Sequence, residues 1–212
     1  MIVYTYTVRV DRGAAPNPFY GICTLAICKP KIRLAAKQED WVVGFGSKNV
    51  GGIDYSGRMV YAMKVTSLMS FSEYDAFCKR KLKGKIPDVS HDDVRRRVGD
   101  CIFDFEKDAD GKLRLSVHTL KNRSNDLSGK NVLLSDQFYY FGDRAVKIPS
   151  QLKDLVVQRQ GHRSTKNDPW KHQFVDWIES NFKANVLYGN PQIQDSKTVQ
   201  RSKRDCEPHK DC

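Results

Sequence analysis

The sequence predicts an α+β fold, in which a small mixed or barrel-like β-sheet has helices packed around it. Apolar side chains alternate along residues 2–10, with the period of two that a half-buried strand shows. Residues 41–46 and 58–68 carry two further strand patterns, and residues 169–182 place their large apolar side chains on one helical face. Together these patterns predict a sheet that is followed by C-terminal helices.

The first strand is expected to end in a loop at residues 11–19. Two prolines flank Asn17 there, and proline cannot donate to a strand ladder. A short helix is predicted to begin at Pro30, because proline is favoured in the first turn of a helix, and to end before residue 38.

Helix signals also occur further along the chain. Ser70 and Glu73 fit a capping box, which predicts a helix that extends to about residue 82. Asp168 is predicted to cap the helix at residues 169–182, with Pro169 in its first position. The other expected elements are a mostly irregular stretch at 83–98, a strand pair at 101–105 and 113–118, a strand at 131–141 with a break near residue 135, and a helix at 150–158.

The 212 residues are expected to form one domain over residues 1–193, followed by a basic flexible tail at residues 194–212. The tail is polar and has no aromatic side chain, so it cannot bury enough surface to offset its ordering. No apolar run approaches the ~18 residues of a membrane span, and we expect no membrane contact. The N-terminus shows no secretory signal, so we expect a cytoplasmic protein whose six cysteines are reduced thiols.

The charge balance points to an anionic partner. The chain carries 36 Lys and Arg against 25 Asp and Glu, a formal net charge of +11. Such a surplus attracts polyanions, nucleic acid first and anionic lipid second. We therefore expect a nucleotide or nucleic acid as the partner, and the alternative is that the charge serves solubility alone.

One short segment suits a phosphate group. Lys29, Lys31 and Arg33 place three cations within five residues, next to the expected helix start. Ser47 follows a glycine-containing strand end, where backbone amides can approach an oxyanion. The sequence contains no nucleoside-triphosphatase P-loop, and a solvated basic face is the alternative interpretation.

Trp41 and Tyr61 are the aromatic side chains that we expect to stack on a base. In nucleic-acid sites the rings commonly hold the base while neighbouring cations hold the phosphates. Both residues lie in strand patterns, so most of the aromatic side chains around them must belong to the core.

A catalytic alternative requires a nucleophile and a base. The candidate polar centre consists of Asn17, Cys23, Arg33 and His162, with Asp40 or Asp136 as a carboxylate. His162 can act as an acid or a base near neutral pH, and Arg163 beside it is a candidate phosphate ligand. Any cysteine nucleophile needs a histidine close in space, which sequence spacing does not show. Buried structural cysteines are the alternative.

Metal binding is not expected from the cysteine pattern. Cys23 and Cys28 have the wrong spacing for a zinc pair, and Cys206, His209 and Cys212 lie in the expected tail. We therefore expect no metal and no cofactor.

Several segments combine into a familiar pattern: residues 15–19, 23–33, 40–47, 60–66, 138–142, 161–163 and 174–178. They resemble the second of the nucleotide modification associated domain families, bacterial and phage proteins linked to hypermodified DNA bases, over most of residues 3–192. Residues 40–66 are also similar to part of PUA-like and EVE-like barrels, which bind modified bases in a cleft lined by aromatic side chains. The resemblance implies a setting of DNA modification or phage–host conflict.

The leading hypothesis is therefore a protein that binds a nucleotide or modified base, with DNA as the favoured source. The resemblance leaves the reaction open, and an enzyme that cleaves or transfers a nucleotide or base group is the first alternative. A protein-interaction module, in which the charge is incidental, is the second.

Overall fold

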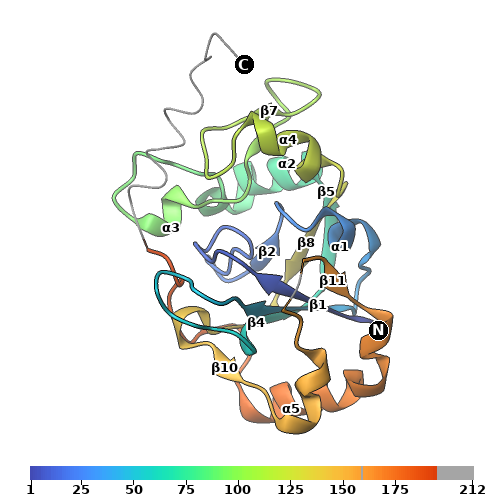
Figure 1. Ribbon diagram of the computed structural model, residues 1–212. Coiled ribbons are helices and arrows are strands. Elements are labelled where there is room, and N and C mark those ends of the chain that lie inside the picture. Colours follow the sequence, from blue (N-terminus) through green and yellow to red (C-terminus); the bar gives the residue numbers. More distant parts are fainter. Residues whose placement is uncertain (159, 195–212) are drawn as a thin grey trace.

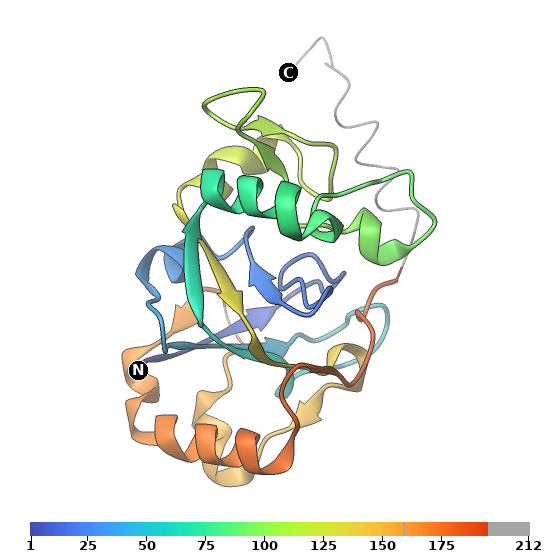
Figure 2. The same cartoon turned by 180° about the vertical axis from the view of Figure 1, so that it is seen from behind.

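The computed structural model describes residues 1–158 and 160–194, and it contains a mixed β-sheet with helices packed around it (Figures 1 and 2). The predicted α+β class is confirmed. Apart from Gln194, the expected tail lies outside the described residues, and so do Cys206, His209 and Cys212.

The main sheet has the strand order β11-β1-β3-β4-β9-β12, with β10 beside β4. Its strands are β1 (Val3–Val8), β3 (Trp41–Gly46), β4 (Arg58–Lys64), β9 (Gln137–Tyr140), β10 (Val146–Lys147), β11 (His162–Arg163) and β12 (Val186–Leu187). β1 and β3 run parallel, whereas β4 is antiparallel to both of its neighbours, β3 and β9. Within the described residues this sheet ends at β11 and β12 without closing, so the barrel-like expectation is wrong.

A second, antiparallel sheet has the order β2-β8-β5, and a third pairs β6 with β7. Their strands are β2 (Cys23–Leu25), β5 (Ser67–Ser70), β8 (Asn131–Ser135), β6 (Phe103–Asp104) and β7 (Lys112–Leu113). β5 continues the chain of β4, and β9 continues that of β8, so two chain segments pass from one sheet to the other. At this crossing the Thr66 amide donates to Leu134 O at 2.9 Å, and the Asp136 amide donates to Thr66 Oγ1 at 3.1 Å.

The helices are α1 (Pro30–Ala35), α2 (Phe71–Lys81), α3 (Val94–Arg97), α4 (Leu120–Leu127) and α5 (Lys171–Asn181), with 3-10 turns η1 (Lys83–Lys85), η2 (Gly142–Arg144), η3 (Ser150–Leu155) and η4 (Thr165–Trp170). α1 begins at Pro30 as predicted. The capping box of α2 is also confirmed, because Ser70 Oγ accepts from the Glu73 amide and Glu73 Oε2 accepts from the Ser70 amide. α5 packs against one face of the main sheet, and α2 and α4 lie at the opposite end of the molecule (Figure 2).

Two helix predictions need correction, and one helix was missed. Asp168 and Pro169 lie inside η4, and Trp170 is the residue that precedes α5. The helix expected at 150–158 is a 3-10 helix at Ser150–Leu155. α4 was not predicted, because its sequence is strongly polar and its large apolar residues are confined to the two ends, Leu120 and Leu127.

The two aromatic residues expected to stack on a base are buried on opposite faces of the main sheet. Trp41 is 1% exposed, with its ring stacked on Tyr139 and edge-on to Phe174 of α5. Tyr61 is fully buried in the other core layer, where its hydroxyl lies 2.8 Å from that of Tyr6. Neither ring can therefore stack on a ligand, because both faces of this sheet are covered.

Replacing Trp41 with alanine tests this placement. Trp41→Ala is expected to lower the free energy of unfolding by about 3–5 kcal/mol, because it removes a large side chain from a packed core. Leu34→Ala, at a residue that is 52% exposed, should change it by less than about 0.5 kcal/mol. Urea denaturation measures both, and a small loss at Trp41 would contradict its burial.

Candidate functional site

A cavity of about 610 Å³ lies where four segments of the chain meet. These are the end of β1, the residues that lead into α1, the region of α4 and the residues around the start of β11. Among the described residues that line it are Arg9, Lys29 and Lys31, two histidines, and no aspartate or glutamate. The lining therefore has the composition of a binding site for an anion.

Lys29 is held at the wall of this cavity by β1. Its Nζ lies 4.3 Å from the centroid of the Tyr6 ring and 3.4 Å from Thr7 O. Burial lowers the pKa of the Lys29 ammonium. Burial also lowers the pKa of His162, and the positive charges of Lys31 and Lys29 lower it further. The effect of the two lysines on His162 indicates a positive potential in the cavity.

Cys28 enters the cavity from a constrained backbone. Cys28 and Lys29 have φ angles of 61° and 41°, the left-handed region that side chains other than glycine rarely adopt. Two hydrogen bonds fix this turn: the Cys28 amide donates to Asp126 Oδ1 at 2.8 Å, and Arg33 Nε donates to Cys28 O at 2.7 Å. The backbone of Cys28 is therefore held at both its amide and its carbonyl, which fixes the position of the half-buried side chain.

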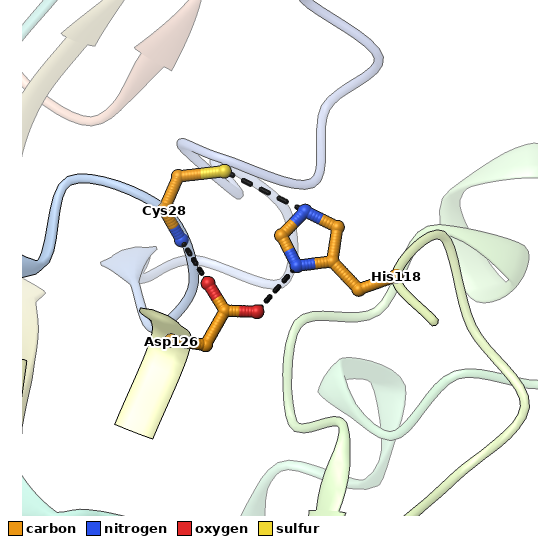
Figure 3. A group of neighbouring side chains, drawn as sticks. All are labelled: Cys28, His118 and Asp126. Carbon is orange, nitrogen blue, oxygen red and sulfur yellow. Dashed lines mark hydrogen bonds and ion pairs between the residues drawn. The ribbon is translucent and has the colours of Figure 1, made fainter. Parts of the chain in front are cut away.

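His118 and Asp126 complete a cluster with Cys28 (Figure 3). His118 Nε2 lies 3.6 Å from Cys28 Sγ, and His118 Nδ1 lies 2.5 Å from Asp126 Oδ2. Burial by itself lowers the pKa of His118, but its hydrogen bonds to Asp126 and Cys28 outweigh burial and raise the pKa to about 10. Asp126 is fully buried, so its carboxylate orients the imidazole from the side that solvent does not reach.

Arg33 serves the structure of this cluster and does not line the cavity. Its fully buried guanidinium donates to Cys28 O, to Asn131 O at 2.8 Å and to Asp126 O at 2.5 Å. Burial lowers the pKa of Arg33 to about 10, which leaves it charged at neutral pH. The predicted phosphate contact of Arg33 is therefore replaced by contacts with backbone carbonyls.

The same three side chains, Cys28, His118 and Asp126, offer donor atoms that lie within 4.8 Å of one another, so a metal ion must be considered. Ligand atoms about 2.0 Å from a tetrahedral ion are about 3.3 Å apart. The 2.5 Å between His118 Nδ1 and Asp126 Oδ2 is instead a hydrogen-bond distance. The geometry therefore fits a thiol–imidazole–carboxylate relay better than a three-ligand metal site.

The other predicted site residues occupy different places. Of the basic and polar candidates, Lys29, Lys31 and His162 come together in the cavity. Ser47 Oγ donates to Arg9 O at 3.3 Å, and Arg163 donates to Asp154 O; neither residue lines the cavity.

The predicted catalytic centre does not assemble around Cys23. Cys23 and Asn17 are fully buried, and burial raises the pKa of the Cys23 thiol to about 12. Asn17 accepts a hydrogen bond from the buried Lys85 and donates to Val98 O. Asp40 accepts the amides of Ile2 and Lys37, which is a structural role. Of this centre only His162 lies at the cavity.

Sequence reasoning missed the Cys28, His118 and Asp126 grouping. His118 and Asp126 are 90 and 98 residues from Cys28, and each side chain by itself is unremarkable in the sequence. The local signal was the position of Cys28 two residues before the helix-starting Pro30, which does not identify its partners.

The fold and the cavity define an α+β protein with a basic pocket beside a Cys–His–Asp cluster. Residues 1–198 match the family described as nucleotide modification associated domain 2, and the chain belongs to that family. No curated protein and no solved structure matches the chain significantly. In residues 1–158 and 160–194, no helix has the length and apolar character needed to cross a membrane.

Arg33→Lys tests the structural role of the guanidinium. An ammonium cannot reach three carbonyls in different directions, so we expect the free energy of unfolding to fall by about 2–4 kcal/mol. Arg80→Lys, on the exposed side of α2, is the matched control and should be near neutral. Equal stabilities of the two variants in urea denaturation would contradict this role.

The charge on His118 should make stability depend on pH. Its pKa rises from 6.5 to about 10 on folding, so the stabilisation is complete below about pH 6.5 and is lost as pH rises toward 10. The free energy of unfolding should therefore fall more between about pH 6 and about pH 9.5 in the wild type than in His118→Gln. His172→Gln, on α5, should retain the wild-type profile. Parallel profiles for wild type and His118→Gln would contradict the prediction.

Proposed function

We propose that this protein binds a nucleotide, either free or as a unit of DNA, in the cavity beside Cys28. The observation that carries the proposal is the excess of cationic side chains over carboxylates in the described lining. Membership of the nucleotide modification associated domain 2 family supports a nucleotide as the anion.

Lys29 and Lys31 are the proposed phosphate ligands, because both belong to the short segment that forms one wall. Their ammonium groups can approach an anion from the same side, and Lys29 is partly desolvated against Tyr6. A cation in a partly dehydrated position interacts more strongly with a phosphate than one in bulk water. Arg9, at the end of β1, lies across the same cavity and can contribute a third charge.

We propose that the base of the nucleotide contacts apolar side chains of the cavity, and not the buried rings of Trp41 and Tyr61. Val10 and Pro30 line the cavity, keep accessible surface and offer such contacts. The volume of about 610 Å³ falls within the range of about 300–1,000 Å³ for small-molecule sites. If DNA is the source, the target nucleotide must leave the base stack to enter, as in other proteins that act on single bases.

Charge removal tests the proposal. Lys29→Gln/Lys31→Gln should weaken binding of deoxynucleoside 5′-monophosphates and of a single-stranded oligonucleotide by about 10-fold or more, because charged hydrogen bonds contribute about 1.5–3 kcal/mol each. Isothermal titration calorimetry at low salt measures the dissociation constants. The dependence of the oligonucleotide affinity on salt should become shallower in the same variant.

Lys147→Gln is the matched control, since Lys147 is exposed on β10 and does not line the cavity. It should bind like the wild type. Absence of binding to the wild-type protein at low salt, or equal losses in the control and the double variant, would overturn the proposal.

A further inference from the structure

The sulfur of Cys28, the imidazole of His118 and the carboxylate of Asp126 follow one another, with Cys28 and His118 at the cavity wall and Asp126 buried behind them (Figure 3). We propose that they form a catalytic centre, in which Cys28 is the nucleophile, His118 its general base and acid, and Asp126 the residue that positions His118. The substrate class is a nucleotide that carries an amide or ester, and the reaction is acyl transfer or hydrolysis. The nucleotide part of this proposal rests on the proposed function.

The order of the contacts fixes the orientation of the imidazole. Asp126 Oδ2 accepts from His118 Nδ1, which leaves Nε2 facing Cys28 Sγ at 3.6 Å. This is the arrangement in which a carboxylate holds the ring while the other ring nitrogen lies beside the nucleophile and exchanges protons at the reaction centre. The second oxygen of Asp126 accepts the Cys28 amide, so one carboxylate orients both reacting residues.

The imidazole of His118 carries a positive charge at neutral pH. The hydrogen bonds of His118 keep a proton on the ring, and an imidazolium beside a sulfur stabilises a thiolate. The charged and titratable groups around the cavity are Tyr6 and Arg9 of the β1 segment, Lys29 and Lys31 of the α1 segment, Asp126 of α4 and His162 of β11. Arg33 lies behind the turn, where it donates to Cys28 O.

Cys28 is more accessible to a ligand or reagent than the other described cysteines. Cys23, Cys78 and Cys101 are buried, whereas Cys28 is half-buried and lines the cavity. Its left-handed backbone is a conformation that costs free energy and commonly persists at functional positions. The three buried thiols are therefore internal controls within the same chain.

Two asparagines of α4 line the same cavity as the nucleophile and suit an acyl substrate. Asn122 and Asn125 line the cavity together with His118. Asn122 Oδ1 accepts from the Thr119 amide at 3.0 Å, which leaves its NH₂ group to donate. An N–H donor beside a thiolate can stabilise the oxyanion that forms when a carbonyl is attacked.

The chemistry balances without a further reactant. The Cys28 thiolate attacks the carbonyl carbon, and the C–N or C–O bond breaks while His118 Nε2 gives its proton to the leaving nitrogen or oxygen. A thioester remains on Cys28. Water, or an amine acceptor, then loses a proton to Nε2 and attacks the thioester carbon. The C–S bond breaks, and the thiolate and imidazolium are restored.

Alkylation by iodoacetamide tests the activation of Cys28. At about pH 6.5, peptide mass mapping should show Cys28 reacting at least about 10-fold faster than glutathione, and faster than the three buried cysteines. His118→Gln should slow this reaction about 10-fold or more, and His172→Gln should leave it unchanged. A rate equal to that of glutathione, or a rate insensitive to His118→Gln, would overturn the proposal.

The role of Asp126 needs a separate readout, because its loss can also weaken the fold. Asp126→Asn keeps an oxygen for the Cys28 amide and removes the charge beside His118. The pH midpoint of Cys28 alkylation in the folded variant should therefore move from that of the wild type. An unchanged midpoint would restrict Asp126 to a structural role and contradict its positioning of His118.

Acyl chemistry is tested with p-nitrophenyl acetate as the probe. The wild type should release p-nitrophenol in a burst, and mass mapping after acid quenching should place one acetyl group on Cys28. Cys28→Ser should lower the rate about 100-fold or more. Acetylation of lysines alone would overturn the proposal. So would a stoichiometric Zn²⁺ complex that is lost in Cys28→Ser, because it would make the cluster a metal site.

The two proposals can fail separately. If the wild type forms acetyl-Cys28 but binds no deoxynucleoside 5′-monophosphate, the proposed function fails while the catalytic centre remains. If it binds the monophosphates but Cys28 is neither activated nor acetylated, the catalytic centre fails alone.

Discussion

The buried guanidinium of Arg33 is the contact on which the rest of the site depends. It donates to backbone carbonyls of Cys28, Asn131 and Asp126, so α1, β8 and α4 are tied to a single planar group. Its Cζ also lies 5.3 Å from the centroid of the Phe71 ring, which adds a cation–π contact. Because a buried charge is tolerated only when its donors are used, this network fixes the turn at Cys28 and the helix that carries Asp126 together.

Much of the fold could be predicted from local patterns, but the partition of strands between sheets could not. The alternation in β1, the proline at the start of α1 and the capping box of α2 are local signals, and each corresponds to the element found. The apolar pattern at 58–68 hides a change of sheet at Thr66, because a strand keeps its period when its neighbours change. The break expected near residue 135 separates β8 from β9, but the pattern did not show that the two strands belong to different sheets. α4 depends on tertiary contacts, which leave little trace in composition.

The candidate site was predicted only in part, for a related reason. Lys29 and Lys31 were found because cations clustered in sequence also cluster in space. Arg33 belongs to the same cluster, yet its side chain is buried. The residue type alone does not show whether an arginine is buried or exposed. Trp41 and Tyr61 lie in strands of a sheet that is covered on both faces. Side chains on either face of these strands are therefore buried. The pairing of Cys28 with His118 is a contact across 90 residues, which no local pattern encodes.

The passage of two strand segments between the sheets has a mechanical consequence. β1 of the main sheet forms one wall of the cavity, and the α1 and α4 segments form another. α1 packs against both α4 and β8. The chain crosses from sheet to sheet twice, with hydrogen bonds at the junction, so the two sheets are joined by two connections and not by a single hinge. For the proposed ligand, this double connection favours binding to a preformed site, in which selectivity comes from the residues that line the cavity.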